Sequence, residues 1–204
     1  MTSTASLRIG LFGGTFDPPH VGHLVTAVNV RHALDLDMVI LMVAGDPWQK
    51  SGSRDVTSAE DRFAMVEAAV SDVEGLVAGR DEVDRGGPSY TADTLLGLAD
   101  KHAGAQLFTI VGDDAAAGLA TWPRVEQVVQ LSQLVVVDRP GVAVELPQQF
   151  NWLRVESPRL EVSSTDLRSR FSDARPLDYL VTEPVLHVIE QRGLYGSSVR
   201  MNRK

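Results

Sequence analysis

Residues 7–23 read LRIGLFGGTFDPPHVGH, and this segment sets the architecture that we expect for the chain. The apolar run Leu7–Phe12 predicts a β-strand, and Gly13 and Gly14 after it predict a tight turn. Apolar periodicity resumes at Val21 and continues to residue 34, which predicts a helix. A strand, a glycine-rich loop and a helix in this order form the unit from which parallel sheets with covering helices are built.

The rest of the sequence repeats this alternation. Apolar runs predict further strands over residues 38–43, 106–111 and 134–137. Helical patterns cover residues 57–70, where Thr57 with Glu60 and Ser58 with Asp61 have capping-box spacing, residues 91–102, and a region that contains Trp122 and Pro123. Residues 76–83 give no clear pattern. We therefore expect an α/β fold, a doubly wound, Rossmann-like and mostly parallel sheet with helices on both faces.

We expect a single domain over residues 7–196, with a flexible N-terminus over residues 1–6 and a flexible basic tail over residues 197–204. Ligands of doubly wound sheets bind beyond the carboxyl ends of the strands. The loops at Gly13, Gly45, Gly112 and Arg139 follow predicted strands, so we expect them to gather at one edge. The loop from Gly45 to Val56 contains Lys50 and Arg54 and is a candidate lid.

Composition restricts the class of function. The 204 residues carry a formal net charge of −8, which disfavours general binding to nucleic-acid backbones. There is no cysteine and no apolar stretch near the ~20 residues of a membrane span, so we expect a soluble cytoplasmic protein with no disulfide and no membrane partner. Assembly into a homo-oligomer stays open.

The loop of the first segment has the features of a phosphate site. Gly13, Gly14, Thr15 and Phe16 lead into the start of a helix, where backbone N–H groups and the positive helix end attract phosphate oxygens. His20 and His23 are three residues apart and can face one triphosphate together, and Gly22 between them leaves room for close approach. Taken alone, a glycine turn with two surface histidines is the simpler interpretation.

A second segment, Val162-Ser163-Ser164-Thr165-Asp166-Leu167-Arg168, changes that balance. Its hydroxyl residues, Ser163, Ser164 and Thr165, stand at a predicted helix start, and Arg168 lies one turn further on. Arg168 could reach a phosphate held at this helix end. The alternative is an ordinary N-cap, because Ser163 and Asp166 also have the spacing of a capping box.

Together the two segments resemble the HxGH nucleotidyltransferases, whose signatures are Pro-x-His-x-Gly-His and Ile-Ser-Ser-Thr-x-x-Arg. Class I aminoacyl-tRNA synthetases share a similar histidine motif, but their lysine-rich second loop is not found here. Within the superfamily, residues from about Arg8 to Tyr195 resemble the bacterial nicotinate-nucleotide adenylyltransferases.

The resemblance assigns further residues. Ser89, Tyr90 and Thr91 are similar to the family segment that lines the nicotinate pocket, although a turn and a helix cap would also explain them. Gly112, Asp113 and Asp114 resemble the segment that meets nucleotide hydroxyls. Trp122 matches the tryptophan beside the nicotinate ring, although a lone Trp usually belongs to a core. Lys50 stands where the family has the lysine of a Pro-Pro-His-Lys loop, but Pro47-Trp48-Gln49 precedes it here. Arg139 lies in an Arg-Pro-Gly segment that is also typical of the family.

The implied reaction joins ATP and nicotinate mononucleotide to give nicotinate adenine dinucleotide and pyrophosphate. His20, His23 and Arg168 are then the catalytic residues, with Mg²⁺ carried on the ATP phosphates and no metal site made by the protein alone. The acceptor phosphate, with a second pKa of ~6, is mostly dianionic at pH 7, so no general base is needed. We expect no covalent enzyme intermediate.

Two other functions stay open at this level. Pantetheine-phosphate adenylyltransferases would share both phosphate signatures but should lack the elements at Ser89-Tyr90-Thr91 and Trp122. A non-enzymatic nucleotide sensor on the same fold is the alternative from another class, because fold does not fix function.

Overall fold

The computed structural model describes residues 6–47, 56–138, 145–158 and 160–199. Six strands form one sheet in the order β3-β2-β1-β4-β5-β6, and all five neighbouring pairs are parallel. The strands are β1 (Arg8–Gly14), β2 (Met38–Val43), β3 (Leu76–Gly79), β4 (Gln106–Val111), β5 (Ser132–Asp138) and β6 (Trp152–Glu156). This order confirms the predicted doubly wound fold.

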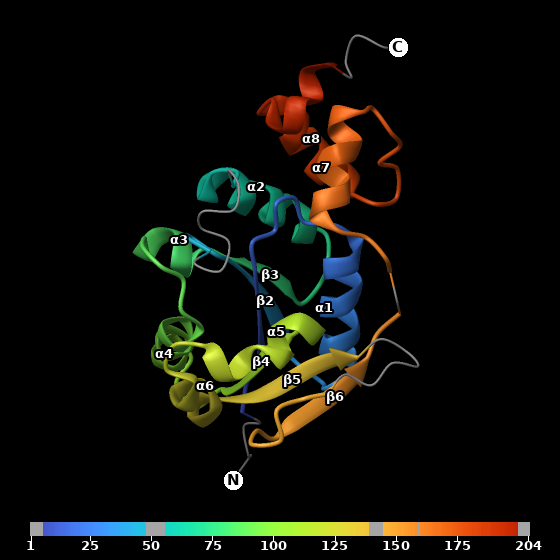
Figure 1. The fold of residues 1–204 in the computed structure, drawn as a ribbon. Helices are drawn as coiled ribbons and strands as arrows, with labels where there is room; N and C mark the ends of the chain where they lie inside the picture. Colours follow the sequence, from blue (N-terminus) through green and yellow to red (C-terminus); the bar gives the residue numbers. More distant parts are fainter. Residues whose placement is uncertain (1–5, 48–55, 139–144, 159, 200–204) are drawn as a thin grey trace.

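Helices cover both faces of the sheet. Their bounds are α1 (Val21–Ala33), α2 (Ala59–Val70), α3 (Asp81–Arg85), α4 (Thr91–Lys101), α5 (Asp113–Ala117), α6 (Val125–Leu131), α7 (Ser164–Ser172) and α8 (Glu183–Gln191), with short 3₁₀ segments η1 (Leu119–Thr121) and η2 (Leu194–Val199). In Figure 1, α1 lies on one side of the strands and α4 with α6 on the other, while α7 and α8 stand beyond one end of the sheet.

Alternation along the strands creates the two cores. Leu41 and its neighbours on one face pack with Val30 of α1 and Val66 of α2. Ile9 and Leu11 point to the opposite face, where they join residues of α4 and α6. Because strand side chains alternate between the faces, the central strands carry nearly continuous apolar runs, as expected for a sheet buried on both sides.

A third cluster joins the C-terminal helices to α2. Met65 and Ala69 of α2 pack with Leu167 of α7 and Ile189 of α8. Helix α2 therefore contacts the sheet with one face and α7 and α8 with another. This arrangement brings the second signature segment to the edge at which the glycine-rich loop leaves β1 (Figure 1).

Several elements differ from the sequence-based prediction. Strand β3 and helix α3 occupy the stretch around residues 76–83 that gave no pattern, and β6 and α8 were not predicted. Trp122 and Pro123 were expected in a helical region but lie between η1 and α6. Strand β3 has only four residues, too few to give a clear apolar pattern. Arg124 has a φ of 56°, outside the helical region, so the helix α6 begins only after it.

The predicted helix starts are found at their caps. The Ser58 hydroxyl oxygen accepts the Asp61 N–H at 3.1 Å, so the Ser58 pair, and not Thr57 with Glu60, caps α2. At the other end of the chain, η2 extends past the predicted boundary at residue 196. Ser197 is buried there, and its hydroxyl donates to the Ile189 carbonyl at 3.1 Å.

We predict that Leu41→Ala lowers the free energy of unfolding by about 2–5 kcal/mol, because it leaves a cavity beside a fully buried strand residue. Leu153→Ala removes the same atoms from the edge strand β6, where the side chain is 36% exposed, and should cost about 1 kcal/mol or less. Urea unfolding of both variants measures the difference. Equal losses would contradict the assignment of β2 to the centre of the core.

Candidate active site

The sheet order reverses between β1 and β4, and a pocket opens where these two strands end. Its volume is ≈ 180 Å³, far more than the ~10–15 Å³ that one water needs. Eight residues that the sequence assigned to the site line it: Gly13, Gly14, Thr15, Ser89, Tyr90, Thr91, Gly112 and Trp122. The structure thus brings together residues from four separate segments of the chain.

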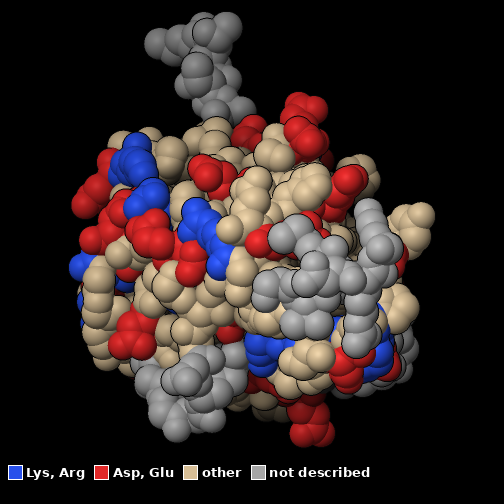
Figure 2. All heavy atoms as spheres, turned by 90° about the horizontal axis from the view of Figure 1, so that it is seen from above, with Lys and Arg blue, Asp and Glu red and all other residues tan. Residues whose placement is uncertain are grey.

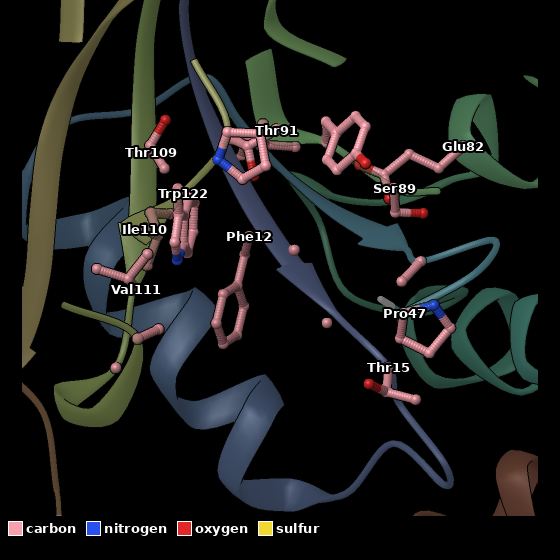
Figure 3. A pocket seen from close by; sticks show the side chains of 18 residues that line it. Phe12, Thr15, Pro47, Glu82, Ser89, Thr91, Thr109, Ile110, Val111 and Trp122 are labelled. Atoms are coloured by element: carbon pink, nitrogen blue, oxygen red, sulfur yellow. The ribbon is translucent and has the colours of Figure 1, made fainter. Parts of the chain in front are cut away.

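Other lining residues were not predicted. Figure 3 shows Thr109, Ile110 and Val111 of β4 along one side of the pocket, with Glu82 and Pro47 on the opposite side, next to the predicted Ser89. The buried Glu82 carboxylate accepts a hydrogen bond from the Thr94 hydroxyl at 2.6 Å. The indole Nε1 of Trp122 is buried, and no hydrogen-bond partner for it occurs among the described residues. This pocket therefore combines aromatic walls with a few polar groups, as small-molecule sites do.

The glycine-rich loop is shaped by Phe16. This residue has a φ of 51° and is 2% exposed, so its ring is held inside the protein at a backbone conformation that is uncommon for a side chain of this size. A Cβ on Gly14 would lie 2.7 Å from the Phe16 ring, which explains the glycine. The same ring meets His23 edge-on with a centroid distance of 4.9 Å. Phe16 thus supports a histidine of the site and does not line the pocket.

The two histidines lie together at the start of α1. Their rings stack with centroids 3.7 Å apart. The backbone N–H of His20 donates to Nδ1 of the His23 ring at 3.2 Å. Because Nδ1 of His23 accepts this bond, the proton of a neutral His23 ring belongs on Nε2. A Cβ on Gly22 would approach the His20 ring to 3.0 Å, so glycine at this position keeps the pair in place.

His20 is neutral at pH 7. Burial lowers the pKa of its imidazole to about 4, because the charged form loses its hydration. Its side chain is 8% exposed, and among the described residues no group bonds to its buried Nδ1. The ring therefore offers a hydrogen-bonding group that the described protein atoms do not satisfy.

The second signature segment docks on the first. Ser164 Oγ donates to the Pro18 carbonyl at 2.8 Å, and Arg168 Nη1 donates to the Asp17 carbonyl at 2.6 Å. Ser163 is the N-cap of α7, since its hydroxyl accepts the Asp166 N–H at 3.2 Å. The segment is therefore a helix cap, and it also places Arg168 beside the loop that leads to the histidines. Nη2 of Arg168 also donates to Thr165 Oγ1 at 3.1 Å.

Asp17 and Tyr195 extend this contact, and sequence reasoning gave neither a role. The Tyr195 hydroxyl donates to Asp17 Oδ1 at 2.6 Å, and the Asp17 side chain is buried. Burial, with the hydrogen bond to Asp17 as a second cause, raises the pKa of the Tyr195 hydroxyl far above its usual value. The C-terminal segment is thereby tied to the loop before the histidines.

The opposite wall of the pocket is built by the start of α4. Thr91 is the first residue of this helix, and its N-cap, Tyr90, makes no side-chain capping bond. The Ser89 hydroxyl oxygen accepts the Gly45 N–H at 2.9 Å. Asp93 in the first turn forms an ion pair with Arg124 at 2.5 Å, and this hydrogen bond holds the Asp93 pKa below its usual range. The first residue of α4 therefore borders a pocket beside which the Asp93 carboxylate already has a partner.

Lys50, Arg54 and Arg139 lie outside the described residues. Gly112 is the N-cap of α5, and Asp113 and Asp114 form the first turn of that helix.

Among residues 6–47, 56–138, 145–158 and 160–199, no group of three or more His, Asp or Glu side chains could hold a metal ion. No helix in those ranges is long and apolar enough to cross a membrane. Figure 2 shows Lys and Arg side chains interspersed with Asp and Glu on the face that it presents.

A pocket at the switch point of a parallel sheet, bounded by a glycine-rich loop that leads to paired histidines, is typical of nucleotide-binding proteins of the doubly wound α/β class. Comparison with known proteins gives the family. Residues 11–170 match the family described as cytidylyltransferase-like. The chain belongs to this family.

Within this family, the chain is similar over its length to proteins of one named activity. A protein of Corynebacterium kroppenstedtii named "probable nicotinate-nucleotide adenylyltransferase" is 42% identical over 198 residues, which cover 95% of this chain and 93% of that protein. A protein of the same name from Bacillus cytotoxicus is 41% identical, with 93% of this chain and 99% of that protein covered.

Solved structures agree in fold. The nicotinic acid mononucleotide adenylyltransferase of Plasmodium falciparum complexed with NaAD superimposes with a TM-score of 0.75 at 14% identity, over 95% of this chain and 99% of that chain.

We predict that acidification from pH 7.5 to pH 5 lowers the stability of the protein partly through His20. Its pKa is 6.5 when unfolded and about 4 when folded, so between these values the unfolded chain binds the proton more tightly. This linkage should remove about 2 kcal/mol of unfolding free energy by pH 5.

Urea unfolding at the two pH values measures the effect. His20→Gln should lose correspondingly less stability over this interval than the wild-type protein does. His187→Gln, which alters an exposed histidine, should retain the wild-type loss. If the three proteins respond equally to pH, His20 is not neutral through burial.

Proposed function

We propose that the chain transfers the adenylyl group of ATP to nicotinate mononucleotide, forming nicotinate adenine dinucleotide and releasing pyrophosphate. The observation that carries this proposal is the pocket in which the glycine-rich loop, the start of α4 and Trp122 meet. The names of full-length relatives with 41–42% identity support the same acceptor. The elements at Ser89-Tyr90-Thr91 and Trp122 favour it over a phosphopantetheine acceptor.

The two substrates have separate places in this arrangement. The triphosphate of ATP lies at the glycine-rich loop, between the histidines and α7, next to Gly14, Thr15 and Ser164. The nicotinate mononucleotide occupies the pocket, with its pyridinium ring against Trp122 and its carboxylate toward the start of α4. A pyridinium ring is cationic, so the indole face of Trp122 attracts it.

The chemistry is a single displacement. An oxygen of the acceptor phosphate attacks the α-phosphorus of ATP, the bond from that phosphorus to the bridging oxygen breaks, and pyrophosphate leaves with the electron pair. The attacking phosphate is already deprotonated near pH 7, so the protein removes no proton. Positioning and charge stabilisation carry the rate enhancement.

His20, His23 and Arg168 stabilise the leaving pyrophosphate. His23 offers its Nε2–H, because its Nδ1 is occupied by the His20 N–H. Neutral His20 contributes one N–H donor, and a phosphate placed beside it would raise its pKa and favour the charged imidazolium. Arg168 supplies the permanent charge and is oriented by its bond to the Asp17 carbonyl.

Magnesium enters as part of the substrate. Mg²⁺ keeps several waters and takes its remaining ligands from phosphate oxygens in such enzymes, so it needs no cage of three protein ligands. When bound, it neutralises charge on the phosphates.

The remaining proposals come from the sequence alone. We place the protein in the cytoplasm, acting on small molecules without nucleic acid or membrane. Its state of assembly, monomer or homo-oligomer, is measured by analytical ultracentrifugation. A nucleotide sensor on the same fold would bind ATP without forming pyrophosphate, so turnover of the wild-type protein separates the two functions.

We predict that His20→Ala and His23→Ala each lower kcat by a factor on the order of 10²–10³, the range for loss of a preorganised donor to developing charge. Steady-state assays of pyrophosphate release with Mg²⁺-ATP and nicotinate mononucleotide measure this change. His187→Ala removes an exposed histidine of α8 and serves as the control, with unchanged kcat. Near-wild-type kcat in both site variants would remove the catalytic role of the pair.

We also predict that the enzyme prefers nicotinate to nicotinamide mononucleotide by about 10- to 100-fold in kcat/KM. The N–H groups at the start of α4 suit a carboxylate, whereas an amide would turn its own NH₂ toward one of them. Such an unpaired donor costs ~1–3 kcal/mol.

The start of α4 allows a sharp test of this preference. Thr91→Pro removes one N–H at the first helical position, where proline is tolerated, and Tyr90 before it already has an extended backbone. Thr91→Val removes the hydroxyl but keeps the N–H. We expect the proline variant to lose much of the preference and the valine variant to lose less. Trp122→Ala should weaken both acceptors equally. Equal kcat/KM for the two acceptors in the wild-type enzyme would contradict this description of the pocket.

A further inference from the structure

Arg62 is a fully buried arginine that neither signature segment contains. It lies near the start of α2, is 1% exposed and shares the buried positions of this helix with apolar residues such as Phe63 and Val66. A guanidinium ion is expensive to bury, and such burial is tolerated only when its N–H groups are well satisfied. The groups that accept hydrogen bonds from the Arg62 guanidinium therefore indicate the structural role of this side chain.

The described partners of Arg62 are backbone carbonyl oxygens of three different segments. Nη1 donates to Thr15 at 3.0 Å and to Ala44 at 2.6 Å. Nη2 donates to Gly45 at 3.1 Å, and Nε donates to Thr57 at 2.8 Å. One planar group thus fixes the glycine-rich loop, the end of β2 and the start of α2 relative to one another.

These carbonyl groups belong to both sides of the site. Thr15 belongs to the glycine-rich loop and lines the pocket. Gly45 leads to the acceptor side, because its N–H donates to Ser89 Oγ at 2.9 Å, and the Ser89 N–H returns a bond to the Asp46 carbonyl at 3.1 Å. Ser89 stands two residues before the first residue of α4. A short chain of bonds therefore connects Arg62 to the elements that hold each substrate.

We propose that Arg62 is a positioning residue that sets the distance between the ATP loop and the acceptor pocket. The proposal rests on the adenylyl transfer proposed above, in which the two phosphates must meet in line. Arg62 acts through the backbone of Thr15 and Gly45. A misplacement of about 1 Å between reacting groups can cost on the order of 10²-fold in rate, so this spacing matters for catalysis.

The guanidinium fork is suited to this task and an ammonium is not. Arginine presents five N–H donors in a fixed plane, whereas lysine presents three donors from one rotating centre. Arg62→Lys keeps the charge but cannot reach the Thr15, Gly45 and Thr57 carbonyl groups in their present directions. Arg62→Gln keeps a shorter planar donor without the charge. Both variants should let the two sides of the site shift relative to each other.

The test compares these variants with Arg8→Lys. Arg8 also donates to a backbone carbonyl, that of Leu34, at 3.0 Å, but it lies at the opposite end of β1 from the site. We expect Arg62→Lys to lower kcat/KM about 10- to 100-fold and to reduce the preference for nicotinate over nicotinamide mononucleotide. Arg8→Lys should leave kcat/KM and the acceptor preference unchanged, even if its melting temperature falls as much as that of Arg62→Lys.

Stability and positioning are separated by the readout. All assays are run at a temperature where thermal unfolding shows each protein to be folded, and Arg62→Gln is used if the lysine variant is not folded at any assay temperature. A purely structural arginine would lower the melting temperature while KM and the acceptor preference stay at wild-type values, and that result would overturn the proposal. Absence of dinucleotide with the wild-type enzyme would instead refute the proposed function.

Discussion

Buried backbone carbonyl groups between Thr15 and Pro18 need hydrogen-bond donors, and the rest of the site is arranged around this need. A loop that leaves a central strand and turns sharply into a helix cannot satisfy these oxygens within itself. Side chains from distant helices supply the donors: Arg62 of α2 for Thr15, Arg168 of α7 for Asp17 and Ser164 of α7 for Pro18. The polar groups that complete the loop also assemble the site.

This requirement explains why the C-terminal helices pack beside the loop that leads to the histidines. Helices α7 and α8 pack on α2 through an apolar cluster, and Tyr195 adds a bond to the Asp17 carboxylate. Their docking places Arg168 beside the histidines, whose own geometry depends on the His20 N–H and on Gly22. The buried His20 ring stays neutral near pH 7, so the permanent positive charge at this end of the site comes from arginine.

Much of this arrangement could be predicted from sequence, because strong local signals carry it. The strand β1, the helix α1, the cap at Ser163 and the alternation of elements follow from apolar periodicity and capping residues. The short strands β3 and β6 could not be predicted this way. Strand β6 lies at the edge of the sheet and has exposed positions, one of which holds Arg154. Its sequence therefore lacks the continuous apolar run of a central strand. Its place in the sheet is decided by tertiary pairing with β5.

The same limit applies to the site. The glycines, the histidines and the segment from Ser89 to Thr91 were identified because they form contiguous motifs. Asp17 and Tyr195 meet across 178 residues of sequence, and no local pattern joins them. The sequence contains one indication of the role of Arg62. It is a charged residue four positions before the apolar Val66, and therefore on the apolar face of a predicted helix.

The central claim is a direct transfer between two substrates held in line, without a covalent enzyme intermediate. The stereochemistry at the α-phosphorus tests it most directly. ATP carrying a single sulfur of known configuration at that phosphorus is converted with nicotinate mononucleotide, and the configuration of the thio-dinucleotide is determined. A single in-line displacement predicts inversion. Retention would show two displacements through an enzyme-bound adenylyl group and would contradict the account.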